Sequence, residues 1–156
     1  MDRTELLDSR IRWRVGRNFP SLPAGRTFFF EQLNQDLQSA IAGVAERHNA
    51  GKPVLAAVNS LDCWTFISTL SVVSQHSSKI HACNLSEIKD LEPRDQMPDG
   101  LSPEGHARWK SSWEYLRITD RADRDHDIWL PPGPEAFVFW STLLMLGRMC
   151  AGVPSF

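Results

Sequence analysis

Residues 131–150 have the sequence PPGPEAFVFWSTLLMLGRMC. The prolines and the glycine end whatever structure precedes them. Pro134 followed by Glu135 is typical of the first turn of a helix, where proline has no N–H to lose and a carboxylate meets the positive end of the helix dipole. Apolar residues occupy most of the circumference beyond that turn, as in a buried helix. At about 16 residues and 1.5 Å per residue, this helix is too short to span a membrane. We therefore predict a C-terminal helix, with Trp140 at its centre, around which a sheet is wrapped.

The chain has 156 residues, enough for one domain with its own core, and we expect a single domain. Its formal net charge of −2 argues against a general nucleic-acid binder, because such proteins are basic overall or along one face. The cysteines Cys63, Cys83 and Cys150 are odd in number and follow no disulfide spacing. Together with a charged start and no signal-peptide core, they lead us to expect a cytoplasmic protein.

An amphipathic helix is predicted from Thr27 to about Asn49. Thr27 is the expected N-cap, and Asn49, Gly51 and Pro53 are expected to end the helix. Apolar residues recur between them at steps of three and four: Phe30, Leu33, Leu37, Ala40, Ile41, Val44 and Ala45. We expect this helix either to cover an open face of a sheet or to form a self-association surface that gives a homodimer.

Short strands follow the helix. β-Branched and aromatic runs separated by turn formers predict an antiparallel meander. The runs are residues 54–58, 63–68, 70–74, 79–85 and 86–91. Prolines and glycines predict a loop over residues 92–105, and a strand at residues 112–119 precedes a charged hairpin turn at 120–127. The predicted fold class is therefore α+β, with an N-terminal helix, an antiparallel sheet of about seven short strands and a buried C-terminal helix.

The stretch CWTFISTLSVV at residues 63–73, followed by NLSEIKDL at residues 84–91, resembles bacterial PH and GRAM domains. In that pleckstrin-homology-like superfold, a hydrophobic strand ending in a threonine turn leads through a hairpin to a strand with the pattern leucine-polar-polar-isoleucine. The resemblance covers about residues 54–149 and implies a strongly bent sheet closed at one end by the C-terminal helix. It implies a PH-like body over residues 54–150, with residues 1–53 as an N-terminal extension.

The resemblance also implies binding rather than catalysis, because PH-like domains mostly bind inositol lipids, peptides or other proteins. Lipid-binding members carry several lysines and arginines in the loop between the first two strands. Here that loop is NSLD at residues 59–62, with one acid and no basic residue. A phosphate-rich headgroup needs charge-assisted donors at such a loop. We therefore do not expect specific binding of inositol lipids.

A basic stripe near the start is the feature that most suggests a partner. Residues 10–15 alternate basic with apolar side chains, which predicts an extended segment with three arginines on one side. The candidate binding residues are Arg10, Arg12, Trp13, Arg14 and Arg17. They could hold an acidic protein face or a nucleic-acid backbone. The alternative is a solvated edge that pairs with the acidic segment 87–105, where six acids outweigh two basic residues.

Metal and catalytic motifs are weak. His81 and Cys83 share one face of a predicted strand with His76 nearby, yet zinc needs three or four ligands and no recognised spacing supplies them. Residues 123–127, DRDHD, begin like a calcium loop but lack the required later glycine and glutamate. We expect no metal and no cofactor. Catalysis would require His106 and Glu104 to meet a cysteine or histidine of the sheet.

Three functions follow from these features. The leading hypothesis is a non-catalytic interaction module that binds an as yet unknown protein. The first alternative is a small enzyme whose site lies near residues 92–111, with that loop acting as a lid. The second is a neutralising, immunity-type protein that binds a partner toxin.

Overall fold

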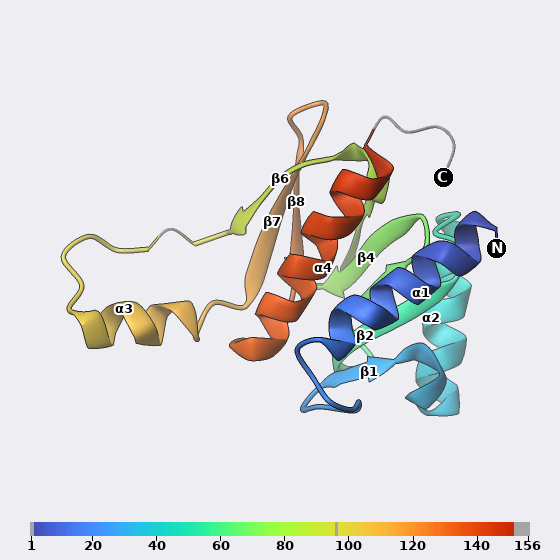
Figure 1. The fold of residues 1–156 in the computed structure, drawn as a ribbon, viewed down its shortest axis with the longest axis horizontal. Helices are drawn as coiled ribbons and strands as arrows, with labels where there is room; N and C mark the ends of the chain where they lie inside the picture. Colours follow the sequence, from blue (N-terminus) through green and yellow to red (C-terminus); the bar gives the residue numbers. More distant parts are fainter. Residues whose placement is uncertain (1, 96, 152–156) are drawn as a thin grey trace.

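The computed structural model describes residues 2–95 and 97–151, and its fold is α+β, as predicted (Figure 1). The helices are α1 (Arg3–Gly16), α2 (Gln35–Arg47), α3 (Pro103–Lys110) and α4 (Pro134–Cys150), with 3-10 turns η1 (Phe30–Gln32) and η2 (Leu85–Glu87). The strands are β1 (Thr27–Phe29), β2 (Pro53–Ser60), β3 (Cys63–Ser68), β4 (Ser71–His76), β5 (Lys79–Asn84), β6 (Ile88–Pro93), β7 (Tyr115–Asp120) and β8 (Asp125–Trp129).

The strands form two antiparallel sheets. The first has the order β1-β2-β3-β4-β5, and the second has the order β6-β7-β8. The predicted strands from residue 54 to residue 85 are confirmed as the meander β2 to β5, and β1 is one strand more than expected. The run 86–91 begins the second sheet at β6, because the turn η2 separates it from β5.

Both faces of the five-stranded sheet are buried. On one face, Ile41 and Val44 of α2 belong to the same apolar cluster as Trp64, Phe66 and Val73 of the sheet. Side chains of a strand alternate between its faces, so the neighbours of these sheet residues point to the opposite side, into the main core. The amphipathic helix predicted to end near Asn49 is α2, and the prediction that it covers a sheet face is confirmed. A homodimer through this helix stays a prediction, and its apolar side is already buried within the chain.

The C-terminal helix begins and ends as predicted, but Trp140 is not at its centre. Phe139 is fully buried, whereas Phe137 is 42% exposed and Trp140 is only partly buried. The reason is that α4 lies against α1, η2 and β6, so one side of the helix stays open to solvent. Among the residues that the structure describes, no helix is long and apolar enough to cross a bilayer.

The predicted extended segment at residues 10–15 is wrong, because these residues lie in helix α1. Leu7, Ile11 and Val15 recur at steps of four and are all buried, whereas Trp13 is 50% exposed. A strand would place Trp13 on the same face as Ile11 and Val15, so this pattern of burial requires a helix. A capping box at the start supports it, since the Asp2 carboxylate accepts the Glu5 N–H at 2.8 Å. The arginines between these positions are therefore spread around the helix rather than aligned along one edge.

The predicted helix starting at Thr27 is wrong in its first third. Thr27 lies in β1 opposite Ala57, because the aromatic run that follows it pairs with the edge of β2. Asn34 is the actual N-cap of α2, and its side chain accepts the Leu37 N–H at 2.9 Å.

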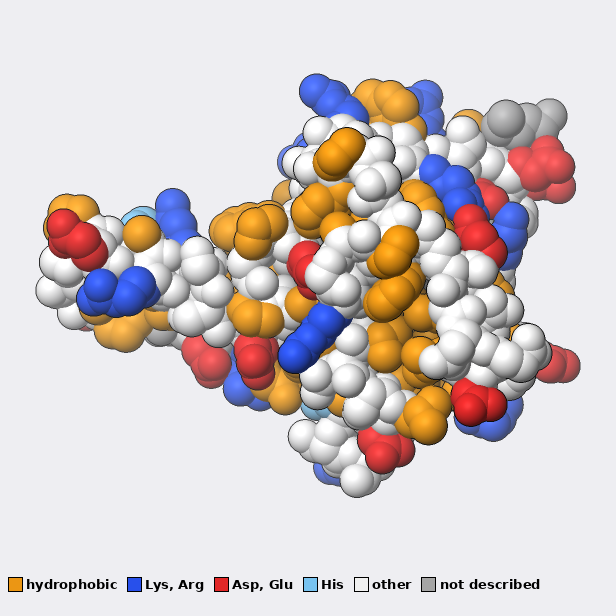
Figure 2. All heavy atoms as spheres, turned by 90° about the horizontal axis from the view of Figure 1, so that it is seen from below, with side chains coloured by type: hydrophobic (Ala, Val, Ile, Leu, Met, Phe, Trp, Pro, Cys, Tyr) orange, Lys and Arg blue, Asp and Glu red, His pale blue; other side chains and the backbone are white. Residues whose placement is uncertain are grey.

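The predicted loop over residues 92–105 ends early. Ser102 caps α3 by accepting the Gly105 N–H at 3.0 Å, and Pro103 occupies the first turn, where it needs no N–H partner. Residues 97–112, which we call the α3 arm, project from the rest of the protein in both views (Figures 1 and 2).

The two sheets are joined by buried polar side chains. Backbone groups of β8 that face away from β7 meet the inner face of β3 and β4. The Thr65 hydroxyl donates to the Trp129 carbonyl, and the Ser74 hydroxyl accepts the Trp129 N–H at 3.0 Å. One residue pair further along, Nε2 of His76 donates to the Asp127 carbonyl at 2.7 Å. This polar junction satisfies a strand edge that would otherwise be buried without partners.

Replacement of Ser74 tests the polar junction. Ser74→Ala leaves the buried Trp129 N–H without an acceptor, so we expect a loss of about 1–3 kcal/mol in the free energy of unfolding. Hydrogen exchange at the Trp129 amide should also become faster. The control is Ser112→Ala, an exposed hydroxyl with a local bond, which should change stability by no more than about 0.5 kcal/mol. Equal losses for the two variants would contradict a special role for the junction.

Two phenylalanines on one helix test the orientation of α4. Phe139→Ala should cost about 3–5 kcal/mol because it empties a fully buried aromatic site. Phe137→Ala, two residues away and exposed, should cost about 1 kcal/mol or less. Equilibrium denaturation measures both, and the reverse ranking would show that α4 is rotated from the orientation described.

Candidate functional site

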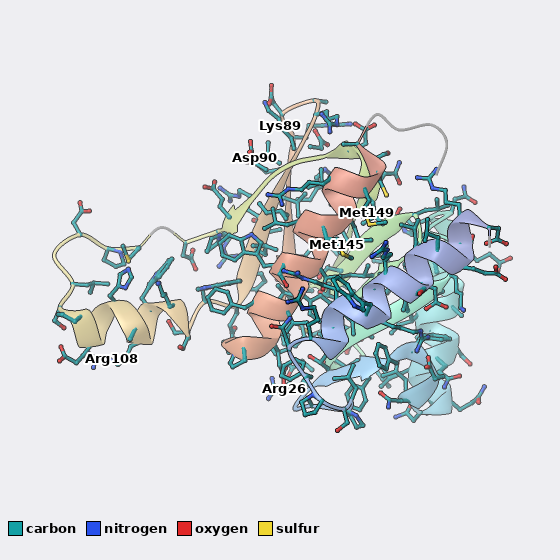
Figure 3. All side chains as sticks on the ribbon, in the orientation of Figure 1. Arg26, Lys89, Asp90, Arg108, Met145 and Met149 are labelled. Atoms are coloured by element: carbon teal, nitrogen blue, oxygen red, sulfur yellow. The ribbon has the colours of Figure 1, made fainter. Side chains whose placement is uncertain are left out.

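A groove lies where α1 and α4 pack together. Its volume is about 440 Å³. Its lining residues come from both helices: Arg10, Trp13, Arg14, Ser141, Leu144, Met145, Arg148 and Met149. Met145 and Met149 are on the side of α4 that faces α1 (Figure 3). The helices are fixed relative to each other, because Leu7, Ile11 and Val15 of α1 are buried in the same cluster as the inner side of α4.

Trp13 is the most exposed aromatic side chain at this groove. Half of its surface, 50%, is open to solvent. Arg10 and Arg17 flank it, with their Cζ atoms 5.9 and 5.2 Å from the indole ring. These positions are three and four residues from Trp13, which places all three side chains on one side of a helix. Each such contact contributes roughly 0.5–1 kcal/mol at an exposed site, and together they favour one orientation of the indole.

The three arginines that line the groove have no ionic partner in the part of the chain that the structure describes. Among residues 2–95 and 97–151, no ion pair involves Arg10, Arg14 or Arg148. The Nε atom of Arg14 is buried and has no hydrogen-bond partner in the same part of the chain. A buried donor without an acceptor is costly, and this Nε atom is covered by atoms of the chain itself.

Arg12 does not belong to the groove. Its guanidinium bonds Asp8 and Glu31, both at 2.6 Å, and lies over the Phe29 ring at 4.7 Å. The hydrogen bond to Glu31 raises the pKa of Arg12 and lowers that of Glu31. Burial alone would raise the pKa of Asp8, but its hydrogen bonds with Lys52 and Arg12 lower it overall. Arg12 therefore ties α1 to the η1 region.

The predicted set of binding residues is thus divided. The structure brings Arg10, Trp13 and Arg14 together, keeps Arg17 beside Trp13, and places Arg12 elsewhere. The alternative, in which the stripe pairs with the acidic segment 87–105, is not what the described residues show. Arg12 pairs instead with Asp8 and Glu31, and no ion pair among the described residues joins Arg10, Arg14 or Arg17 to that segment.

Sequence reasoning missed the α4 half of the groove. Arg148 and Met149 come three and four residues after Met145, which places both beside Met145 on one side of a helix. The sequence of α4 carries that signal, but it does not show that α1 lies opposite. The packing of two helices more than 100 residues apart is a tertiary feature.

Two histidines from neighbouring strands, His76 of β4 and His81 of β5, stack at the polar junction. His76 is 7% exposed, and its ring stacks on that of His81 with centroids 4.5 Å apart. Its Nε2 donates to the Asp127 carbonyl, and its Nδ1 is buried without a hydrogen-bond partner among the described residues. Burial, followed by the charge of His76, lowers the pKa of His81. Both effects disfavour the charged imidazolium.

The candidate catalytic and metal-binding groups lie apart in the described part of the chain. Burial raises the pKa of Cys83 to about 12, so near neutral pH it is a thiol rather than a reactive thiolate. Within residues 2–95 and 97–151, no group of three or more histidine, cysteine or acidic side chains could hold a metal ion. His106 and Glu104 lie on the α3 arm, away from the sheet histidines, so the predicted meeting of these groups under a lid is not seen (Figure 1).

Comparison of the chain with models of known protein families, with curated proteins and with solved structures finds no match. The resemblance to PH-like domains therefore stays a prediction.

The stacked histidines predict a pH dependence of stability. The pKa of His81 is lower in the folded protein than its ordinary value of 6.5, so the unfolded chain binds more protons as the pH falls below about 6.5. The free energy of unfolding should therefore decrease from about pH 6.5 to pH 5, and His81→Gln should reduce this decrease. Above about pH 7.5 His81 is neutral in both states, so the two curves should run parallel there. An unchanged slope below pH 6.5 in the variant would rule out His81 as the cause.

Proposed function

We propose that this chain is a non-catalytic, protein-binding module and that the groove between α1 and α4 is its binding surface. The observation that carries the proposal is the exposed indole of Trp13 beside an apolar groove edged by arginines. Tryptophan, methionine and arginine are enriched at protein interfaces, and tryptophan and arginine dominate binding hot spots.

The construction of the groove supports binding without rearrangement. Both helices contribute to the main core, through Ile11 on α1 and Phe139 on α4. Side chains on such rigid elements lose little freedom when a partner binds, so more of the interaction energy remains as affinity. The flanking guanidiniums of Arg10 and Arg17 add to this by restricting Trp13.

The chemistry of the candidate catalytic residues favours binding over the enzyme alternative. Cys83 is a buried thiol, the Nε2–H of His76 is already donated to Asp127, and His106 lies on the separate α3 arm. A nucleophile and its base need to lie within hydrogen-bond reach of each other. The free thiols of Cys63, Cys83 and Cys150 suit a reducing compartment such as the cytoplasm, where we place the partner.

Capture of proteins from an extract of the cells that make this chain tests the proposal. Immobilised wild type and Trp13→Ala are compared by quantitative mass spectrometry, with circular dichroism confirming that both are folded. We expect one or a few proteins to be retained by the wild type and lost from Trp13→Ala. The matched control is Leu61→Ala, whose side chain is similarly exposed (56%) on the β2–β3 turn. Identical retention by wild type and Trp13→Ala, or no retention by the wild type, would contradict the proposal.

A further inference from the structure

The groove has an apolar part and a positively charged part. Its apolar part consists of Trp13, Leu144, Met145 and Met149. Its charged part consists of Arg10, Arg14 and Arg148. Of the residues that the structure describes, neither an aspartate nor a glutamate lines it. Three positive charges therefore lie together on a chain whose net charge is −2, without an acid among the lining residues to neutralise them.

The groove arginines differ from arginines elsewhere in the chain that form ion pairs. Arg12 and Arg117 hold carboxylates at 2.6 and 3.0 Å. In contrast, Arg148 is exposed, and no ion pair among the described residues involves it. A free guanidinium presents a planar set of donors that matches a carboxylate, often through two parallel hydrogen bonds.

The positions of the charges fit a segment with acids on both sides. Arg10 and Arg14 are four residues apart on α1, a rise of about 6 Å along the helix axis. Arg148 comes from α4, on the other side of the groove. Carboxylates that meet both sides must come from different residues of the ligand, with an apolar side chain between them.

The apolar part of the groove also requires a matching ligand. Trp13 and Leu144 are 50% and 39% exposed, so a bound apolar side chain would remove a large area from water. The unbranched side chains of Met145 and Met149 can adapt to its shape. The volume of about 440 Å³ is within the usual range of ligand pockets.

We infer that the partner presents a short acidic amphipathic segment, in which a large apolar side chain enters the α1–α4 groove and flanking aspartates or glutamates meet Arg10, Arg14 and Arg148. This inference rests on the proposed function and specifies the partner of that site. A nucleic-acid backbone fits less well, because its affinity depends on many phosphate contacts, whereas this groove offers three cations beside an apolar surface.

Selection from a random library of displayed 12-residue peptides tests the inference. The folded chain is the bait, in parallel with the variants Arg10→Glu/Arg148→Glu and Trp13→Ala. We expect the peptides enriched by the wild type to carry Asp or Glu on both sides of Leu, Phe, Met or Trp. A synthetic copy of the strongest binder should lose affinity as the salt concentration rises, and should bind the double variant at least about tenfold more weakly.

The α3 arm provides the matched control. Arg108→Glu/Lys110→Glu makes the same change in net charge on exposed residues, far from Met145 and Met149 of the groove (Figure 3). This control variant should bind the synthetic peptide within about twofold of the wild type, since rim or remote charges mostly change the association rate. An equal loss in both double variants would show only a general effect of charge and would overturn the inference.

The remaining outcomes separate the inference from the proposed function. Enriched peptides that lack acids but depend on Trp13 would overturn the acidic partner and leave protein binding intact. A library without any groove-dependent binder would overturn both. Three further arms use single-stranded DNA, phosphatidylserine vesicles and the chain alone in sedimentation. Binding to the DNA or to the vesicles that is stronger than binding to the peptide would overturn the inference if the variant Arg10→Glu/Arg148→Glu abolished that binding. A dimer of the chain that this variant dissociated would overturn it as well.

Discussion

The outer edge of β8 requires partners for its backbone, and the side chains that supply them fix the position of the second sheet. Trp129 and Asp127 direct backbone groups away from β7, toward the inner face of β3 and β4. Another strand would satisfy them by a ladder and extend the sheet. Here the Thr65 and Ser74 hydroxyls and the His76 ring do so instead, and Ser74 also lies 2.7 Å from Thr65. The sheets consequently meet at a junction of side chains.

This junction determines where the core can lie. Both sheets contribute to one apolar core, and α4 packs into it against α1, η2 and β6, with Phe139 and Leu143 fully buried. α1 closes the same core from the side through Leu7, Ile11 and Val15. Each of the two helices buries only one side in the core. Their remaining sides, where the helices meet, line the groove. The candidate site is therefore a consequence of how the two sheets are joined.

The arginines of α1 divide between stability and binding. Arg12 satisfies Asp8 and Glu31 and so connects α1 with η1. Arg10 and Arg14 face the groove, where no acid meets them among the described residues. The helix accommodates both roles because successive side chains turn by about 100°. An extended strand with the same alternation would have placed all of these arginines on one edge.

The sequence by itself determined the elements whose signals are local. Strand β3 and helix α4 have the predicted bounds, because alternating or continuous apolar runs end at strong turn formers or at proline and glycine. The fold class followed from the order of such elements. Trp13, Arg10 and Arg14 were also identified as binding candidates, since an apolar side chain among closely spaced arginines is visible in the sequence.

Only the tertiary structure decided the conformation of segments whose sequence fits both a strand and a helix. Residues 10–15 fit both an alternating strand and a helix with a buried step of four, and the structure selects the helix by burying Ile11 and Val15 while leaving Trp13 exposed. Thr27 begins a strand because the edge of β2 offers backbone partners that a helix there would leave unused. The groove has the same origin. Arg148 and Trp13 are 135 positions apart, and their meeting depends on the packing of α4 against α1, which local propensity does not contain.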